Sequence, residues 1–174
     1  PRTMEFNYLW CCWFNVTAAT EIYILSLHDA LPISYEQIRN SIAYVNANVK
    51  FGLSHSGLSV GEDGGSHQSI EDIALMRVVP NMTVFVPCDP IETRKAVFAA
   101  VEIDGPVYIR VARPVVETIT APQTPFIPGK IVRLREGSDA CILATGLMVK
   151  EALKAAEFLA DRKSTRLNSS HGKL

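Results

Sequence analysis

The side chains best suited to chemistry in this chain lie close together, in residues 54–68. This stretch carries two imidazoles and two adjacent carboxylates set among glycines: His55, Glu62, Asp63 and His67. Imidazole exchanges protons near neutral pH, and glycine lets the backbone approach a ligand closely. Taken alone, this composition fits both a ligand-binding loop and an ordinary glycine-rich surface turn with solvated polar groups.

The flanking residues place this loop between a strand and a helix. Residues 49–53 form a short, largely apolar run that predicts a buried strand. Ser69 and Asp72 have the spacing of a capping box, in which each side chain binds a free backbone N–H, so a helix is predicted to begin there. Open α/β sheets bind ligands in loops of this kind, at the carboxyl ends of parallel strands.

Helical and strand patterns alternate along residues 35–112. The predicted helices cover residues 35–46, 70–79 and 90–102, and the predicted strands cover residues 49–53, 83–87 and 107–112. Ile38, Ile42 and Val45 give the first helix its apolar face. This alternation predicts an α/β fold with a Rossmann-like, doubly wound parallel sheet.

Local signals set two of the helix ends. Pro80 is expected to end the second helix, since the residue before a proline is pushed out of the helical region. Asp89 is expected to cap the third helix, with Pro90 in its first turn, where the missing N–H has no cost.

A second segment follows a proline-rich linker at residues 114–129. Residues 130–135 alternate like a half-exposed strand, residues 140–146 predict a buried strand, and residues 149–159 predict a helix. These patterns predict a second, shorter α/β segment from about residue 130.

Composition limits the class of protein. The 174 residues are 48% hydrophobic with a net charge of −1, so a buried core is feasible and no nucleic-acid partner is expected. No apolar run approaches the roughly 18 residues of a membrane span. The four cysteines (Cys11, Cys12, Cys88 and Cys141) lack metal-ligand spacing. The adjacent Cys11 and Cys12 cannot easily close a normal disulfide, so a reduced, cytoplasmic protein is expected.

The spacing of the loop resembles a known family. His55, Asp63 eight residues later, and then residues 66–68 (Ser-His-Gln) stand where the thiamine-diphosphate enzymes of the transketolase family keep their pyrimidine-domain motif. The resemblance runs from about residue 35 to residue 160, and it is strongest to the separate carboxyl-terminal subunit of a two-subunit transketolase. Gly65 departs from the usual Pro or Ala of that motif.

The resemblance implies roles for four residues. His67 would contact the donor's reacting end, Asp63 would bind a hydroxyl beside the acceptor carbonyl, and His55 would lie near the sugar phosphate. Arg113 stands roughly where the family binds that phosphate, with Arg110 as a near competitor. Each also has a structural alternative, as a strand-end histidine, a turn residue or a surface charge. Glu62 is expected only to structure the loop, and Cys88 and Cys141 to belong to the core.

The resemblance also implies cofactors and partners. Thiamine diphosphate would carry the carbanion chemistry, and its diphosphate and Mg²⁺ would be held mainly by a diphosphate-binding partner subunit, in a dimer or heterotetramer acting on sugar phosphates. The family's catalytic glutamate and ring-packing aromatic residues precede the matching region, and neither Glu21 nor Glu36 has the right context. The chain alone is therefore expected to be inactive.

The two ends differ from the rest. Residues 1–34 and 163–174 resemble translated sequencing-adapter DNA, and are expected to lack consistent secondary structure and to pack poorly on the core. The predicted domains are then residues 35–113 and residues 130–162, and the first sheet is expected to lack its first strand, leaving an unpaired edge. A genuine amphipathic extension is the alternative for residues 1–34.

Other functions remain open from the sequence. A 1-deoxyxylulose-5-phosphate synthase would more typically carry His-His than His67-Gln68, and the 2-oxo-acid dehydrogenase β subunit lacks the Gly-Glu-Asp-Gly form seen at residues 61–64. The alternative from a different class is a non-catalytic fragment, an interaction piece or a chain that is no working protein at all.

Overall fold

The computed structural model describes residues 12–17, 20–26 and 35–170, with side chains described for residues 35–161. Its strands are β1 (Cys12–Thr17), β2 (Thr20–Ser26), β3 (Val49–Ser54), β4 (Thr83–Phe85) and β5 (Val107–Arg110). Its α-helices are α2 (Asp72–Val78), α3 (Pro90–Glu102) and α4 (Met148–Ser170), and shorter turns form η1 (Ile38–Ala43), η2 (Leu58–Val60) and η3 (Gly65–His67).

The five strands form one sheet in the order β1-β2-β3-β5-β4. Strands β2, β3, β5 and β4 are parallel, and β1 joins the edge antiparallel to β2. The predicted α/β fold with a parallel sheet is confirmed. Parallel strands need crossover connections. The segment between β2 and β3 contains η1, the one between β3 and β4 contains α2, and the one between β4 and β5 contains α3.

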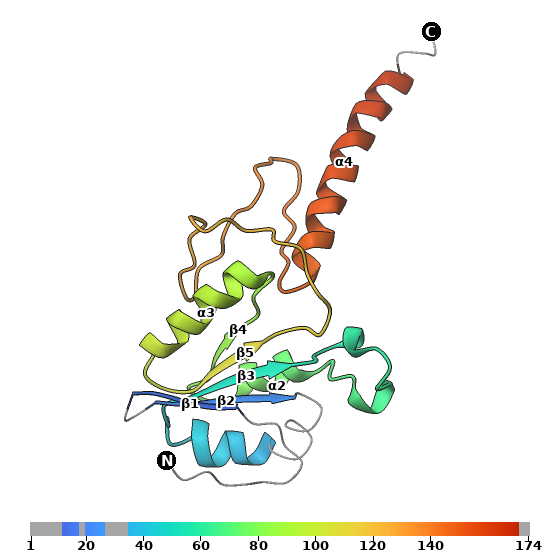
Figure 1. Ribbon diagram of the computed structural model, residues 1–174. Coiled ribbons are helices and arrows are strands. Elements are labelled where there is room, and N and C mark those ends of the chain that lie inside the picture. Colours follow the sequence, from blue (N-terminus) through green and yellow to red (C-terminus); the bar gives the residue numbers. More distant parts are fainter. Residues whose placement is uncertain (1–11, 18–19, 27–34, 171–174) are drawn as a thin grey trace.

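The two faces of the sheet bury different residues. One face packs Val49, Phe51 and Leu53 of β3 and Tyr108 of β5 against Ile38 and Met76. The other packs Val107 and Ile109 of β5 with Phe85, Ala96 and Ala100. Because successive strand residues point to opposite faces, β5 contributes to both clusters. In Figure 1, α3 and η1 lie on opposite sides of the sheet, which makes it doubly wound.

The start of α3 matches its predicted signals. The Asp89 side chain accepts a hydrogen bond from the Glu92 N–H (2.7 Å), and Pro90 occupies the first turn. Glu92 completes the motif, because its Oε2 accepts the Cys88 N–H at 2.7 Å. Two otherwise unpaired backbone donors are therefore bound at this helix end.

Two predicted helix features are wrong. Helix 35–46 becomes a π-helix over Ile38–Ala43, whose wider turn removes Val45 from the apolar face and leaves it 61% exposed. The capping box at Ser69 and Asp72 does not form: Glu71 is the N-cap, without a side-chain cap bond. Asp72 is buried and bonds to β5 instead.

The expectation for the amino-terminal tail is wrong over β1 and β2. Strand β2 pairs in parallel with the whole of β3, from Glu21 opposite Val49 to Ser26 opposite Ser54, so the edge of β3 predicted to be open is covered. The run at residues 20–26 is rich in β-branched and aromatic types, and an unpaired sheet edge accepts such a strand readily. The burial of Trp10 and Trp13 lies outside the described side chains, and the origin of residues 1–34 stays a prediction.

The second segment also differs from its prediction. Residues 130–135 and 140–146 form no strand, and α4 continues through residues 163–170, where consistent structure was not expected. In the described part of the chain no strand lies beside these two extended runs to complete a ladder, and strands do not persist unpaired. In Figure 1, α4 projects away from the body of the molecule.

Candidate functional site

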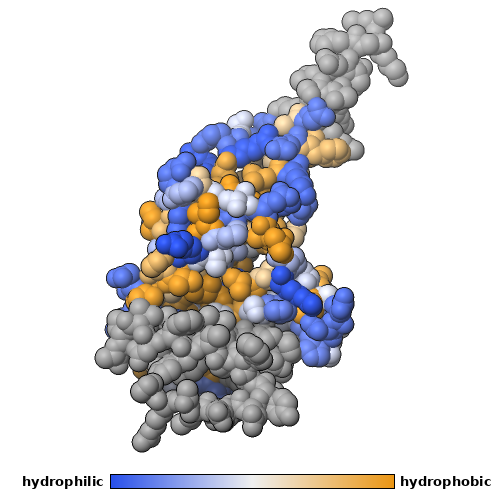
Figure 2. All heavy atoms as spheres, in the orientation of Figure 1, coloured by the Kyte–Doolittle hydropathy of each residue, from blue (hydrophilic) through white to orange (hydrophobic). Residues whose placement is uncertain are grey.

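The loop that carries the predicted site leaves the sheet at the end of β3 and returns at α2. Figure 1 shows it projecting beyond the carboxyl end of β3, and Figure 2 shows the same lobe as largely hydrophilic. It contains the short turns η2 and η3, each preceded by a glycine with positive φ: Gly57 at 78° and Gly64 at 75°. The sequence therefore places the loop correctly.

Two contacts close the base of the loop. The Gly57 N–H donates to the Ser69 carbonyl at 2.9 Å, which joins the two ends of the excursion. The buried Ser56 hydroxyl donates to the Val111 carbonyl at 3.2 Å, which ties the loop to the residue after β5. Farther out, the Gln68 amide donates to the Leu58 carbonyl at 3.3 Å.

Both predicted histidines bond to the serine before them. The Nδ1 atoms of His55 and His67 lie 2.8 Å from the hydroxyl oxygens of Ser54 and Ser66. Both rings are half-buried. His55 has a positive φ of 65°, an uncommon backbone conformation for a residue with a side chain.

The structure joins the two charged candidates. Arg113 Nη1 lies 3.1 Å from Asp63 Oδ2, and the same nitrogen donates to the Val60 carbonyl. The side chains of Arg113 and Asp63 are 40% and 42% exposed, so the pair faces solvent. The convergence of His55, Asp63 and His67 on one cleft stays a prediction.

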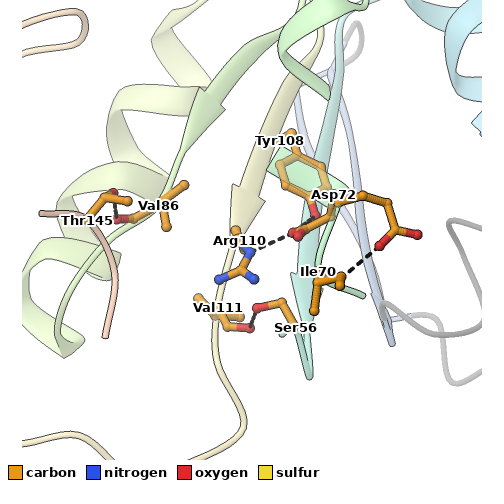
Figure 3. A network of polar contacts seen from close by, with 9 residues as sticks. Ser56, Ile70, Asp72, Val86, Tyr108, Arg110, Val111 and Thr145 are labelled. Atoms are coloured by element: carbon orange, nitrogen blue, oxygen red, sulfur yellow. Dashed lines mark hydrogen bonds and ion pairs between the residues drawn. The ribbon is translucent and has the colours of Figure 1, made fainter. Parts of the chain in front are cut away.

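Arg110, the near competitor for the phosphate role, has a different environment (Figure 3). Its Nε donates to Asp72 Oδ2 at 2.6 Å, and the Tyr108 hydroxyl donates to the same oxygen at 2.9 Å. Burial, together with the Asp72 charge, raises the pKa of the Tyr108 hydroxyl, which stays protonated as a donor. Sequence reasoning missed this cluster because it assigned Asp72 to a helix cap.

A second buried carboxylate holds the linker. Asp89 accepts hydrogen bonds from the backbone N–H groups of Ile119 (2.8 Å) and Thr120 (2.5 Å), in addition to its capping bond. Burial alone would raise the pKa of Asp89, but these backbone donors and the Thr120 hydroxyl outweigh it and lower the pKa below its ordinary value. The proline-rich linker is therefore fixed to the start of α3.

The described residues do not by themselves suit a metal or an aminopyrimidine ring. No group of three or more His, Cys, Asp or Glu side chains among them is arranged to bind a metal ion. The two buried carboxylates, Asp72 and Asp89, are both bonded within the protein, so neither is available to a cofactor ring. An open cavity of about 360 Å³ lies at the start of α3, lined in part by Cys88 and Arg94, and none of its lining residues belongs to residues 54–68.

The described part of the chain holds no helix that is both long and apolar enough to cross a membrane.

Comparison with sequence families gives two matches. Residues 14–118 match the pyrimidine-binding domain of transketolase, and residues 129–166 match the transketolase C-terminal domain.

Individual relatives agree with these matches. A putative transketolase C-terminal section from Methanocaldococcus jannaschii is 45% identical over 130 residues, covering 74% of this chain and 41% of the relative. A 6-deoxy-6-sulfo-D-fructose transketolase subunit from a Clostridium species is 46% identical over 125 residues, covering 72% and 39%. The chain thus spans about two fifths of the length of these curated relatives.

A solved structure described as a split gene transketolase, inactive beta4 tetramer, superposes with a TM-score of 0.74 at 44% identity. The match covers 82% of this chain and 45% of that one. The first family match alone covers more than half of the chain. The chain belongs to the transketolase family.

Proposed function

We propose that this chain supplies the sugar-phosphate side of a thiamine-diphosphate transketolase, which transfers a two-carbon ketol unit between sugar phosphates. The observation that carries the proposal is the Asp63–Arg113 pair, held at 3.1 Å on the loop after β3 in a member of this family. When bound, thiamine diphosphate supplies the stabilisation of the carbanion. The residues of this chain bind and orient the sugar.

The proposed roles follow from the chemistry of each group. The Arg113 guanidinium, which is half-exposed, offers N–H donors to a phosphate, and Asp63 accepts a hydrogen bond from a sugar hydroxyl. His55 lies near the phosphate, and His67 contacts the donor's reacting end and moves a proton. In the free chain Asp63 and Arg113 bind each other. A substrate with both phosphate and hydroxyl groups replaces this ion pair by two contacts, from its phosphate to Arg113 and from its hydroxyl to Asp63.

The assembly is part of the proposal. A diphosphate-binding subunit would hold the diphosphate and Mg²⁺, in a dimer or heterotetramer with this chain. Two observations support this: both buried carboxylates, Asp72 and Asp89, are engaged internally, and the solved relative is described as an inactive beta4 tetramer. Several relatives are themselves separate sections or subunits of transketolases. The chain alone is then inactive.

The test combines the purified chain with a matching diphosphate-binding subunit, thiamine diphosphate, magnesium and a ketose phosphate donor. We expect no turnover from the chain alone, and none from this mixture unless the family's native upstream segment is also supplied. Turnover well above a blank, by the isolated chain or by the mixture without that segment, would contradict the account. Two further donors are tested in place of the ketose phosphate: a 6-deoxy-6-sulfo sugar and pyruvate. They separate ketol transfer between ordinary sugar phosphates from transfer to or from a sulfo-sugar, and from the 1-deoxyxylulose-5-phosphate synthase and 2-oxo-acid dehydrogenase alternatives.

Substrate binding is tested separately, by titrating a ketose phosphate into Arg113→Gln and into a control. Removing one charged hydrogen bond is expected to weaken binding by about tenfold or more. Arg133→Gln is the matched control, because Arg133 forms only a surface ion pair with Glu136 at 3.0 Å and is 73% exposed. Equal affinities for the two variants would remove Arg113 from the site.

A further inference from the structure

His55 is held in an uncommon backbone conformation, with φ at 65°. A residue with a side chain stays in the left-handed region only where its surroundings fix it. On one side, Ser54 ends β3 and pairs with Ser26 of β2. On the other, Ser56 bonds to the Val111 carbonyl and Gly57 bonds to the Ser69 carbonyl. The conformation of His55 therefore depends on how firmly Ser56 and Gly57 are held.

Arg110 lies directly against Gly57. A Cβ atom placed on Gly57 would come within 3.1 Å of Arg110 Nη2, so the guanidinium packs closely on the glycine backbone. Gly57 has φ 78° and ψ −166°, a combination that belongs almost only to glycine. The backbone conformation requires the glycine, and the arginine beside it leaves little room for a Cβ atom.

The guanidinium cannot swing away from this position easily, because Asp72 holds its Nε. Arg110 Nε donates to Asp72 Oδ2 at 2.6 Å, and Asp72 is 1% exposed. Figure 3 shows Arg110 between Asp72 on one side and the Ser56–Val111 contact on the other. Arginine suits this place because its planar group reaches two partners at fixed angles, which an ammonium does not.

We propose that the Asp72–Arg110 pair is a positioning device for the substrate loop, and that it holds His55 in place through Gly57. Arg110 is then a positioning residue and not a phosphate ligand. Helix α2, which carries Asp72, is linked in this way to the loop that precedes it. The inference rests on the proposed function only where it assigns His55 to the substrate site.

The test uses the full chain and needs no turnover, so a failure of the proposed activity would leave it intact. In Arg110→Lys, a cation stays beside Asp72 while the planar contact with Gly57 is lost. We expect amide hydrogen exchange at Gly57 to accelerate by about tenfold or more, relative to the Thr93 amide in the first turn of α3, which donates to the Asp89 carbonyl at 2.9 Å, because local opening becomes easier. The NMR signals of the His55 ring are expected to shift in the same variant.

Val107→Ala is the matched control, because Val107 lies in the core on the opposite face of the sheet. Val107→Ala lowers the overall stability, so it should change amide exchange at Gly57 and at Thr93 by the same factor. If Arg110→Lys leaves exchange at Gly57 and the His55 signals like those of the control, the pair is merely structural and the proposal is overturned. Asp72→Asn provides a second variant of nearly unchanged shape, and is expected to move the same two readouts.

Discussion

Two regions of this chain carry sequence patterns for strands, and only one of them forms strands. Residues 49–53 and 107–112 become β3 and β5, whereas residues 130–135 and 140–146 stay extended and unpaired in the described structure. The difference lies in the neighbours. Strand β3 is hydrogen-bonded on both sides, by β2 and β5, and its residues Phe51 and Leu53 are buried.

The second region has no such neighbours among the described residues. Ile131 and Leu143 are 82% and 73% exposed, and Figure 2 shows hydrophobic residues interspersed with polar ones over this part of the surface. Two hydrogen bonds that join this region to the first go to the Val86 carbonyl, which accepts from the Thr145 hydroxyl and the Gly146 N–H, both at 3.2 Å. A strand pattern therefore predicts a strand only where neighbouring strands are present to pair with the segment.

The two cysteines with described side chains give the largest expected contrast between the regions. Burial, together with the hydrogen bond and charge of Glu92, raises the pKa of the Cys88 thiol to about 12, whereas Cys141 is exposed. At pH 8, Cys88 holds about a thousandfold less thiolate than an ordinary exposed thiol, and thiolate is the reacting form. Alkylation followed by peptide mapping should label Cys141 long before Cys88.

Peptide mapping separates the labelling of Cys88 and Cys141 from that of Cys11 and Cys12. Cys141→Ser is the control, because it should remove the fast labelling assigned to Cys141. Rapid labelling of Cys88 would mean that the first region opens as readily as the second. Cys141 was expected to be a core residue, and its exposure is a further correction.

Leucine truncation compares the two regions by stability. Leu53 is fully buried in β3, so Leu53→Ala is expected to cost about 3 kcal/mol of unfolding free energy through lost burial and the cavity left behind. Leu143→Ala, the matched control in the second region, should change it by no more than about 0.5 kcal/mol. Urea denaturation measures both. Similar costs for the two variants would show that residues 140–146 are buried in solution.

Asp89 should make the first region sensitive to acid. Its folded pKa is lowered, so the unfolded chain takes up the proton first as pH falls, and the stability that Asp89 gives above its ordinary pKa of about 3.9 is lost below it. Asp89→Asn should cost about 2 kcal/mol at neutral pH, because a buried charged acceptor is lost, and should flatten the stability curve below pH 4.

Asp139→Asn, at an exposed position of the second region, serves as the control. An equal acid response in Asp89→Asn and the parent chain would mean that Asp89 does not fix the linker.

Sequence patterns predicted the elements of the first region well, because local signals and tertiary burial agree there. Asp89 with Pro90 predicted the start of α3, and the apolar run at residues 49–53 predicted β3, after which the candidate loop begins. Asp72 was misassigned because its partners, Tyr108 and Arg110, lie 36 and 38 residues away in the chain. Likewise, no local signal shows that Arg113 meets Asp63, or that residues 20–26 pair with β3.

The smallest effect is expected at the ion pair between the linker and α4. Lys150 Nζ lies 2.7 Å from Glu117 Oε1, and the neighbouring ammonium, through this hydrogen bond and its charge, lowers the pKa of the Glu117 carboxyl. Glu117 is nevertheless 77% exposed, so water and salt screen the attraction, and holding two long side chains in place has an entropic cost. We expect Glu117→Gln to leave the urea midpoint unchanged at low and at high salt. A clear, salt-sensitive loss would show that the second region contributes to the stability of the first, and that the contrast between them is smaller than their burial indicates.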